Sequence, residues 1–86
     1  MKSSVATRFW REYFALPKDV QRKARKAFLL WRRDPRHPSL RFERKGRYWS
    51  VRIDRGWRAL ARLEGGTVYW LAILSHDDYQ RVLRGK

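Results

Sequence analysis

The chain has 86 residues and carries 22 Lys or Arg against eight Asp or Glu, which gives a formal net charge of +14 at pH 7. This charge indicates a polyanionic partner. The length predicts a single domain over residues 1–86 and excludes a second one. A hydrophobic content of 43% excludes a disordered basic tail.

The residue types that are rare or absent narrow the chemistry further. There is no Cys, which excludes disulfides and thiolate catalysis. His37 and His76 lie far apart along the chain and give no ligand cluster of the usual spacing, so neither a metal ion nor another cofactor is expected. No apolar run is long enough to span a membrane, and no signal peptide is evident. We therefore expect a cytoplasmic protein with no membrane partner.

The first half of the chain has the apolar spacing of two helices. The first is predicted from Thr7, a candidate N-cap, until Pro17 ends it. The second runs from Pro17 to about Arg33, and its apolar stripe consists of Val20, Ala24, Ala27, Phe28 and Trp31. Its opposite side is basic and includes Arg25 and Lys26. The two helices predict a hairpin with a basic outer face.

The second half changes to the alternating pattern of strands. Two prolines within residues 34–39 stop the helix. Strands are predicted near 40–45, 48–54, 57–64 and 67–75, and a short helix is predicted over 77–84 with Ser75 or Asp77 as its cap. The fold class is α+β: an N-terminal helical hairpin packed on a four-stranded antiparallel meander, followed by a short C-terminal helix.

Turn positions predict the strand register, which sorts the side chains between two faces of the sheet. The glycine turn at 65–66 places Ala61 opposite Trp70 and Arg58 opposite Ile73, and the loop at 54–56 places Arg52 opposite Arg58. The face predicted to pack on the helices is apolar and consists of Trp49, Val51, Ile53, Trp57, Ala59, Ala61, Leu63, Val68, Trp70, Ala72 and Leu74. The other face, the candidate site, consists of Tyr48, Ser50, Arg52, Arg58, Leu60, Arg62, Tyr69, Leu71, Ile73 and Ser75.

The opposition of Arg52 and Arg58 is the first chemical signal. Like charges that face each other across antiparallel strands are destabilising, so the pair favours an anion between them. Guanidinium groups match phosphate oxygens, and Tyr48 and Tyr69 beside them can stack on bases, a composition typical of an RNA platform. The alternative is a solvated face on which the arginine stems lie over apolar neighbours.

His76 ends the last predicted strand, from which its side chain can reach the basic face. Imidazole donates or accepts protons near neutral pH, which cleavage of an RNA phosphodiester by its internal 2′-hydroxyl requires. The alternative for His76 is a structural role at the strand end. For His37, in a loop between prolines, the alternative is an ordinary surface position.

The order of several short motifs resembles the RelE/ParE superfamily of toxins from bacterial type II toxin–antitoxin systems, in particular RelE, YoeB and HigB. The matching motifs are Phe9-Trp10, Leu16-Pro17, residues 34–40, residues 48–53, residues 57–60 and residues 75–79, which together extend over nearly the whole chain. The resemblance implies a helical hairpin on an antiparallel sheet. It also implies a basic concave face that an acidic antitoxin covers.

The ribonuclease branch of the superfamily implies a ribosome-bound toxin that cleaves mRNA without a metal and inhibits translation. By this resemblance the catalytic residues are Arg58, His76 and Arg52, and the predicted RNA-binding residues are Tyr48, Arg62, Tyr69, Tyr79, Arg25 and Lys26. YoeB-like members place a carboxylate base where this chain has Pro38, so the base is assigned to His76, with His37 as the alternative. ParE-like inhibition of DNA gyrase, or an inactive member that only binds RNA, are the other interpretations.

Overall fold

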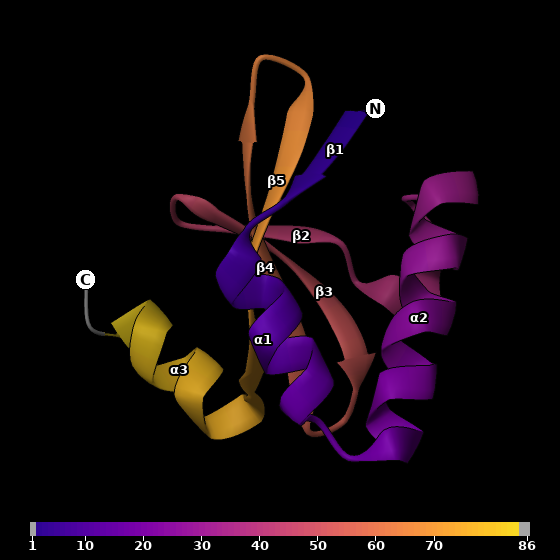
Figure 1. The fold of residues 1–86 in the computed structure, drawn as a ribbon. Helices are drawn as coiled ribbons and strands as arrows, with labels where there is room; N and C mark the ends of the chain where they lie inside the picture. Colours follow the sequence, from indigo (N-terminus) through magenta and orange to yellow (C-terminus); the bar gives the residue numbers. More distant parts are fainter. Residues whose placement is uncertain (1, 85–86) are drawn as a thin grey trace.

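The computed structural model describes residues 2–84 and has a mixed five-stranded sheet with helices on both faces (Figure 1). The elements are β1 (Lys2–Val5), α1 (Thr7–Ala15), α2 (Lys18–Arg33), a 3₁₀ helix (Pro38–Leu40), β2 (Glu43–Lys45), β3 (Tyr48–Asp54), β4 (Trp57–Glu64), β5 (Thr67–Ser75) and α3 (His76–Arg84). Their order across the sheet is β1-β5-β4-β3-β2. The helices α1 and α2 cover one face, and α3 packs on the other.

The helices α1 and α2 have the predicted spans because proline interrupts the helix between them. Pro17 has no amide hydrogen and is the N-cap residue of α2. In the first turn of α2, the side-chain amide of Gln21 donates to the carbonyl oxygens of Phe14 and Leu16 at 3.3 and 3.0 Å. The N-cap of α1 is Ala6, one residue before the predicted one. The helix α1 packs on β5, whereas α2 packs on β3, so the predicted hairpin is open between its two helices.

The strands β3, β4 and β5 have the predicted bounds. The strand β2 is shorter than predicted, because Pro38–Leu40 form a 3₁₀ helix. The Nδ1 atom of His37 accepts a hydrogen bond from the Ser39 amide at 3.2 Å and caps this helix. The structure therefore gives the His37 ring a local structural role.

The predicted four-stranded meander was incomplete, because β1 adds a fifth strand at the edge of the sheet. It runs parallel to β5, with Lys2 beside Thr67 and Val5 beside Trp70. Its sequence, Lys-Ser-Ser-Val, has a single apolar residue and no alternation, so no local pattern predicts a strand. Pairing with β5 is what makes this segment extended.

The register predicted for the second half of β5 was wrong by one residue. Ala61 pairs with Trp70 as predicted, but beyond a bulge Arg58 pairs with Leu74 instead of Ile73. A slip of one residue exchanges the faces on which side chains lie. Ile73, predicted on the site face, is buried beneath α1 and α2 with Tyr13, Leu16 and Val20. Ala72 and Leu74, predicted beneath the hairpin, pack instead with Leu60 and Tyr79 under α3.

The main core lies between α2 and the sheet. The rings of Trp31 and Trp70 meet edge to face with centroids 5.1 Å apart, a geometry that adds about 0.5–1.5 kcal/mol to the burial of the two side chains. Val51, Ala61 and Val68 complete its floor. Leu63 was predicted for this core but is 37% exposed, because it lies near the tip of the β4–β5 hairpin, beyond the helices (Figure 1).

Candidate nucleic-acid interface

Arg58 lies half-buried near the start of β4, on the face of the sheet that α3 covers. Its Nη1 donates to the carbonyl oxygens of Asp54 and Trp57 at 2.5 and 3.0 Å, and its guanidinium carbon lies 5.9 Å from the centroid of the Tyr79 ring. Within residues 2–84, no hydrogen bond uses Nε or Nη2. The guanidinium is therefore held in place with two nitrogens remaining for a ligand.

Arg52 on β3 pairs directly with Arg58, so this part of the predicted register is confirmed. Burial lowers the pKa of Arg58 most, and the charge of Arg52 lowers it further; a smaller lowering comes from Arg41, while Tyr79 and Asp54 act in the opposite direction. No acidic side chain in residues 2–84 forms an ion pair with either member of the pair. A bound anion would stabilise this uncompensated charge.

His76 is tied to the same turn that holds Arg58. Its backbone amide donates to the Gly56 carbonyl at 2.8 Å, and the side chain is 47% exposed. The helix α3 begins at His76, one residue earlier than predicted, and the Ser75 hydroxyl accepts from the Asp78 amide at 3.2 Å. Of the two predicted caps, Ser75 is the correct one. The turn thus holds the backbone of His76 at the end of the sheet where Arg58 lies.

Tyr79 does not offer its ring to a base. The residue is only 5% exposed, and it packs on Leu60 and Leu74. Its hydroxyl lies 3.2 Å from the Ser50 Oγ, at hydrogen-bond distance. The structure places Tyr79 beneath the Arg58 guanidinium, as a support for it rather than as the exposed RNA contact that was predicted.

The other predicted RNA-binding residues of the sheet lie further from Arg58. Arg62 pairs with Tyr69 across β4 and β5, and Tyr69 is 39% exposed and open to stacking. Arg62 also forms an exposed ion pair with Glu64. Tyr48 on β3 is half-buried against the cluster under α3. Tyr79 packs between Arg58 and these residues. The predicted site face is therefore divided into one end with Arg52 and Arg58 and another end with Tyr48 and Tyr69.

Arg25 and Lys26 are not brought to this face. Both belong to α2, which packs on the opposite side of the sheet. The Nη1 of Arg25 donates to the Tyr13 hydroxyl on α1 at 2.5 Å, so Arg25 bridges the two open helices, and Lys26 is exposed on α2. The structure therefore does not place them with Arg58 in one site.

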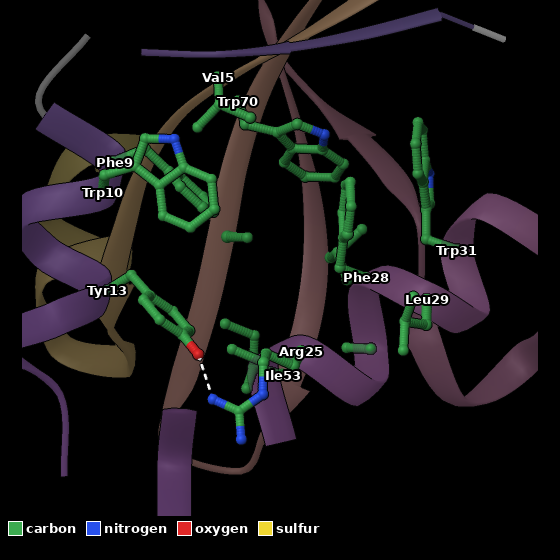
Figure 2. Close-up of a pocket in the computed structure, with 14 residues that line it drawn as sticks. Val5, Phe9, Trp10, Tyr13, Arg25, Phe28, Leu29, Trp31, Ile53 and Trp70 are labelled. Carbon is green, nitrogen blue, oxygen red and sulfur yellow. Dashed lines mark hydrogen bonds between the residues drawn. The ribbon is translucent and has the colours of Figure 1, made fainter. Parts of the chain in front are cut away.

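An apolar groove of about 300 Å³, which was not predicted from the sequence, opens between α1 and α2 (Figure 2). Figure 2 shows Trp10 and Tyr13 on one side, Phe28 and Leu29 on the other, and Trp70 beyond them. Trp10 and Leu29 are 47% and 57% exposed. Apolar stripes on two neighbouring helices predict a closed hairpin, so the splay of α1 from α2 had no signal in the sequence.

Residues 2–84, the described part of the chain, hold neither a cluster of metal-ligating side chains nor a membrane-spanning helix. No group of three His, Cys, Asp or Glu side chains in this range is arranged to hold a metal ion. No helix in this range is long and apolar enough to cross a bilayer.

Three solved toxin structures have the same fold. A YoeB/ParE toxin from Agrobacterium tumefaciens is 22% identical, with 88% of this chain and 99% of that one covered and a TM-score of 0.67. A chain of the RelBE2 toxin–antitoxin complex from Mycobacterium tuberculosis is 23% identical over 87% and 96%, with a TM-score of 0.63. A chain of the RelB–RelE complex from Methanococcus jannaschii is 13% identical over 91% and 95%, with a TM-score of 0.66.

The sequence comparisons give the family. Comparison with curated proteins finds no match. Residues 18–81 match the family model of the ParE-like toxin domain, which is more than half of the chain. The chain therefore belongs to the ParE-like toxin family, within the RelE/ParE superfamily that its sequence motifs predicted.

Proposed function

We propose that the chain is the toxin of a type II toxin–antitoxin system and acts as a ribosome-associated endoribonuclease that cleaves mRNA and inhibits translation. The observation that carries this proposal is the half-buried Arg58 directly opposite Arg52, with no acidic partner for either within residues 2–84. The Arg58 guanidinium, held by backbone carbonyls and facing Arg52 with no acidic partner in residues 2–84, suits the phosphodiester of an RNA strand.

In the proposed reaction, the three candidate side chains act on one phosphodiester of the RNA. The 2′-oxygen of the RNA attacks the adjacent phosphorus, a bond from O2′ to phosphorus forms, and the bond from phosphorus to O5′ breaks. Arg58 and Arg52 stabilise the charge that develops on the phosphate oxygens. His76 either accepts the proton of the 2′-hydroxyl or donates one to the leaving 5′-oxygen, and water accepts or supplies the other proton. The products are a 2′,3′-cyclic phosphate and a 5′-hydroxyl, and the step needs no metal or cofactor.

Gyrase inhibition is the second candidate, because the family model that matches the chain is that of the ParE-like toxin domain. One experiment distinguishes ribonuclease activity from gyrase inhibition. The toxin is expressed in cells, mRNA ends are mapped by primer extension, and the purified protein is added to a gyrase supercoiling reaction. Ribonuclease activity predicts new mRNA ends and normal supercoiling. Intact mRNA with inhibited supercoiling would reject the ribonuclease.

The protein partner that we propose for this chain is an acidic antitoxin. Two of the structural relatives are toxin–antitoxin complexes, and the net charge of +14 favours an acidic polypeptide. The groove between α1 and α2 offers an apolar floor with Arg25 at its edge. This combination suits an amphipathic helix whose apolar side enters the groove and whose flank is acidic. We therefore place one antitoxin segment in this groove.

A further inference from the structure

We propose that Asp54 is a positioning residue of the candidate RNA site, because its carboxylate closes the β3–β4 turn to which Arg58 and the backbone of His76 are both bonded. This inference rests on the proposed function, since it assigns a role within the same reaction. The sequence predicted Asp54 only as part of the loop at 54–56. The bonds that meet at the turn, the backbone of the turn and the surroundings of the carboxylate support the proposal.

Three hydrogen bonds meet at the β3–β4 turn. The Oδ1 of Asp54 accepts from the Gly56 amide at 2.8 Å, which is an Asx turn. The carbonyl oxygen of Asp54 accepts from Arg58 Nη1 at 2.5 Å, and the carbonyl oxygen of Gly56 accepts from the His76 amide at 2.8 Å. The carboxylate therefore closes the turn between the two carbonyl groups that hold Arg58 and the backbone of His76.

The backbone of this turn supplies little that would fix its shape without the side chain. The register between β3 and β4 shifts between Arg52 and Asp54, so the ladder is interrupted beside the turn. Short hairpin turns are most favourable when a loop residue has a positive φ, but neither Arg55 nor Gly56 has one. The Asx bond of Asp54 thus provides a closure that the backbone conformation does not.

The hydrogen bond of Asp54, rather than its charge, accounts for this role. Burial is the main cause that lowers the pKa of Arg58, and the charge of Asp54, which raises this pKa, makes the smallest contribution. The carboxylate also pairs with Lys23 on α2 at 3.4 Å, and the Lys23 side chain is 54% exposed. An exposed ion pair of this kind contributes little to stability. An uncharged side chain with the same oxygen should therefore close the turn as aspartate does.

Three variants separate the hydrogen bond from the charge in a cleavage assay on ribosomes. Asp54→Ala removes both, and it should lower the maximal single-turnover rate by about 10–10²-fold at an unchanged half-saturating toxin concentration, because the reacting groups are misplaced. Asp54→Asn should recover most of the lost rate, because asparagine forms the same turn. Lys23→Met removes only the ion pair and should have the wild-type rate.

A second measurement does not depend on cleavage. Hydrogen exchange followed by NMR reports the bond between the His76 amide and the Gly56 carbonyl. In Asp54→Ala the His76 amide should exchange at least about tenfold faster than in the wild type, whereas Asp54→Asn and Lys23→Met should leave its exchange unchanged. The amide of Trp31, which lies inside α2 and is 1% exposed, is the internal reference and should change by less than that of His76.

The outcomes distinguish this inference from the proposed function. Wild-type cleavage by Asp54→Ala, a higher half-saturating concentration in place of a lower rate, or equal loss of rate in Asp54→Ala and Asp54→Asn would overturn the inference and leave the ribonuclease standing. Loss of rate in Lys23→Met, an unfolded Asp54→Ala protein, or equal acceleration of exchange at His76 and Trp31 would also overturn it. If the wild type cleaves no mRNA while the His76 amide depends on Asp54 as expected, the ribonuclease is rejected and the role of Asp54 in the turn stands.

Discussion

The carboxylate of Glu12 on α1 accepts a hydrogen bond from the backbone amide of Ile73 on β5, with 2.8 Å between Oε1 and the amide nitrogen. The strand β1 ends at Val5, beside Trp70, so no strand continues alongside Ile73 on that side of β5. Glu12 supplies the missing acceptor just beyond the β5 bulge. This contact stabilises the register in which Leu74 faces α3 and Ile73 faces α1 and α2.

Removing that acceptor tests its contribution to the fold. Glu12→Ala should lower the free energy of unfolding by about 1–3 kcal/mol, because it leaves a partly buried amide without a partner. Glu12→Gln keeps an oxygen acceptor, so its free energy of unfolding should fall by less. Arg8→Ala is the control, since it removes only the exposed ion pair with Glu12 and should be about as stable as wild type. Urea unfolding measures all three, and equal stability of Glu12→Ala and wild type would contradict the role of this bond.

Arg58 should be needed for cleavage and not for folding. Arg58→Ala should slow cleavage of ribosome-bound mRNA by about 10²–10³-fold, the loss expected when one donor to a developing oxyanion is removed. The side chain lies off the main core, so the circular dichroism spectrum should stay that of the wild type. Arg58→Lys keeps the charge but not the planar group, so its cleavage rate should lie between those of the wild type and Arg58→Ala. An unfolded Arg58→Ala protein would show that its bonds to the β3–β4 turn are mainly structural.

Tyr79 should act through the fold and through Arg58, not through contact with RNA. Tyr79→Phe leaves the buried Ser50 hydroxyl without its partner and should cost about 1–3 kcal/mol of stability. Adding Ser50→Ala should restore much of the lost stability, because both polar groups are then absent. RNA affinity should stay unchanged in the single and the double variant. A weaker affinity for Tyr79→Phe at full stability would mean that the hydroxyl contacts RNA directly.

The groove between α1 and α2 should be needed for the antitoxin and not for cleavage. Leu29 lines the groove and is 57% exposed, so Leu29→Glu should fold normally and place a negative charge against an acidic antitoxin. Its affinity for the antitoxin, measured by calorimetry, should fall at least tenfold while mRNA cleavage persists. Phe14→Glu is the control, because Phe14 is 69% exposed but does not line the groove. Equal loss in both variants would place the antitoxin elsewhere.

The parts of the fold that the sequence predicted correctly depend on local signals. Pro17 separates the helices, and Gly65 and Gly66 adopt the positive φ that their tight turn requires, so α1, α2, β4 and β5 could be assigned from the chain itself. The opposition of Arg52 and Arg58 followed from the short loop between their strands. Arg52 on β3 and Arg58 on β4 flank this loop, which is why the arginine pair could be predicted.

The parts that were missed depend on contacts between distant residues. The β5 bulge is held by Glu12, 61 positions away, and no turn or periodicity encodes it. The strand β1 exists because it pairs with β5, and the groove exists because α1 and α2 pack on different strands. Tyr79 was placed among the RNA contacts because aromatic residues on a basic surface favour stacking, whereas the helix α3 turns its ring into a small core.

The proton transfer assigned to His76 is the central chemical claim, and an end-group analysis of cleaved mRNA tests it directly. Wild-type toxin, added to purified ribosomes on a defined mRNA, should produce fragments with a 2′,3′-cyclic phosphate and a 5′-hydroxyl. His76→Gln should bind the same ribosomes with unchanged affinity and form these fragments about 10²–10⁴-fold more slowly. Cleavage by His76→Gln at the wild-type rate, or no fragments from the wild type at any concentration, would contradict the assignment of this chain as a histidine-dependent ribonuclease.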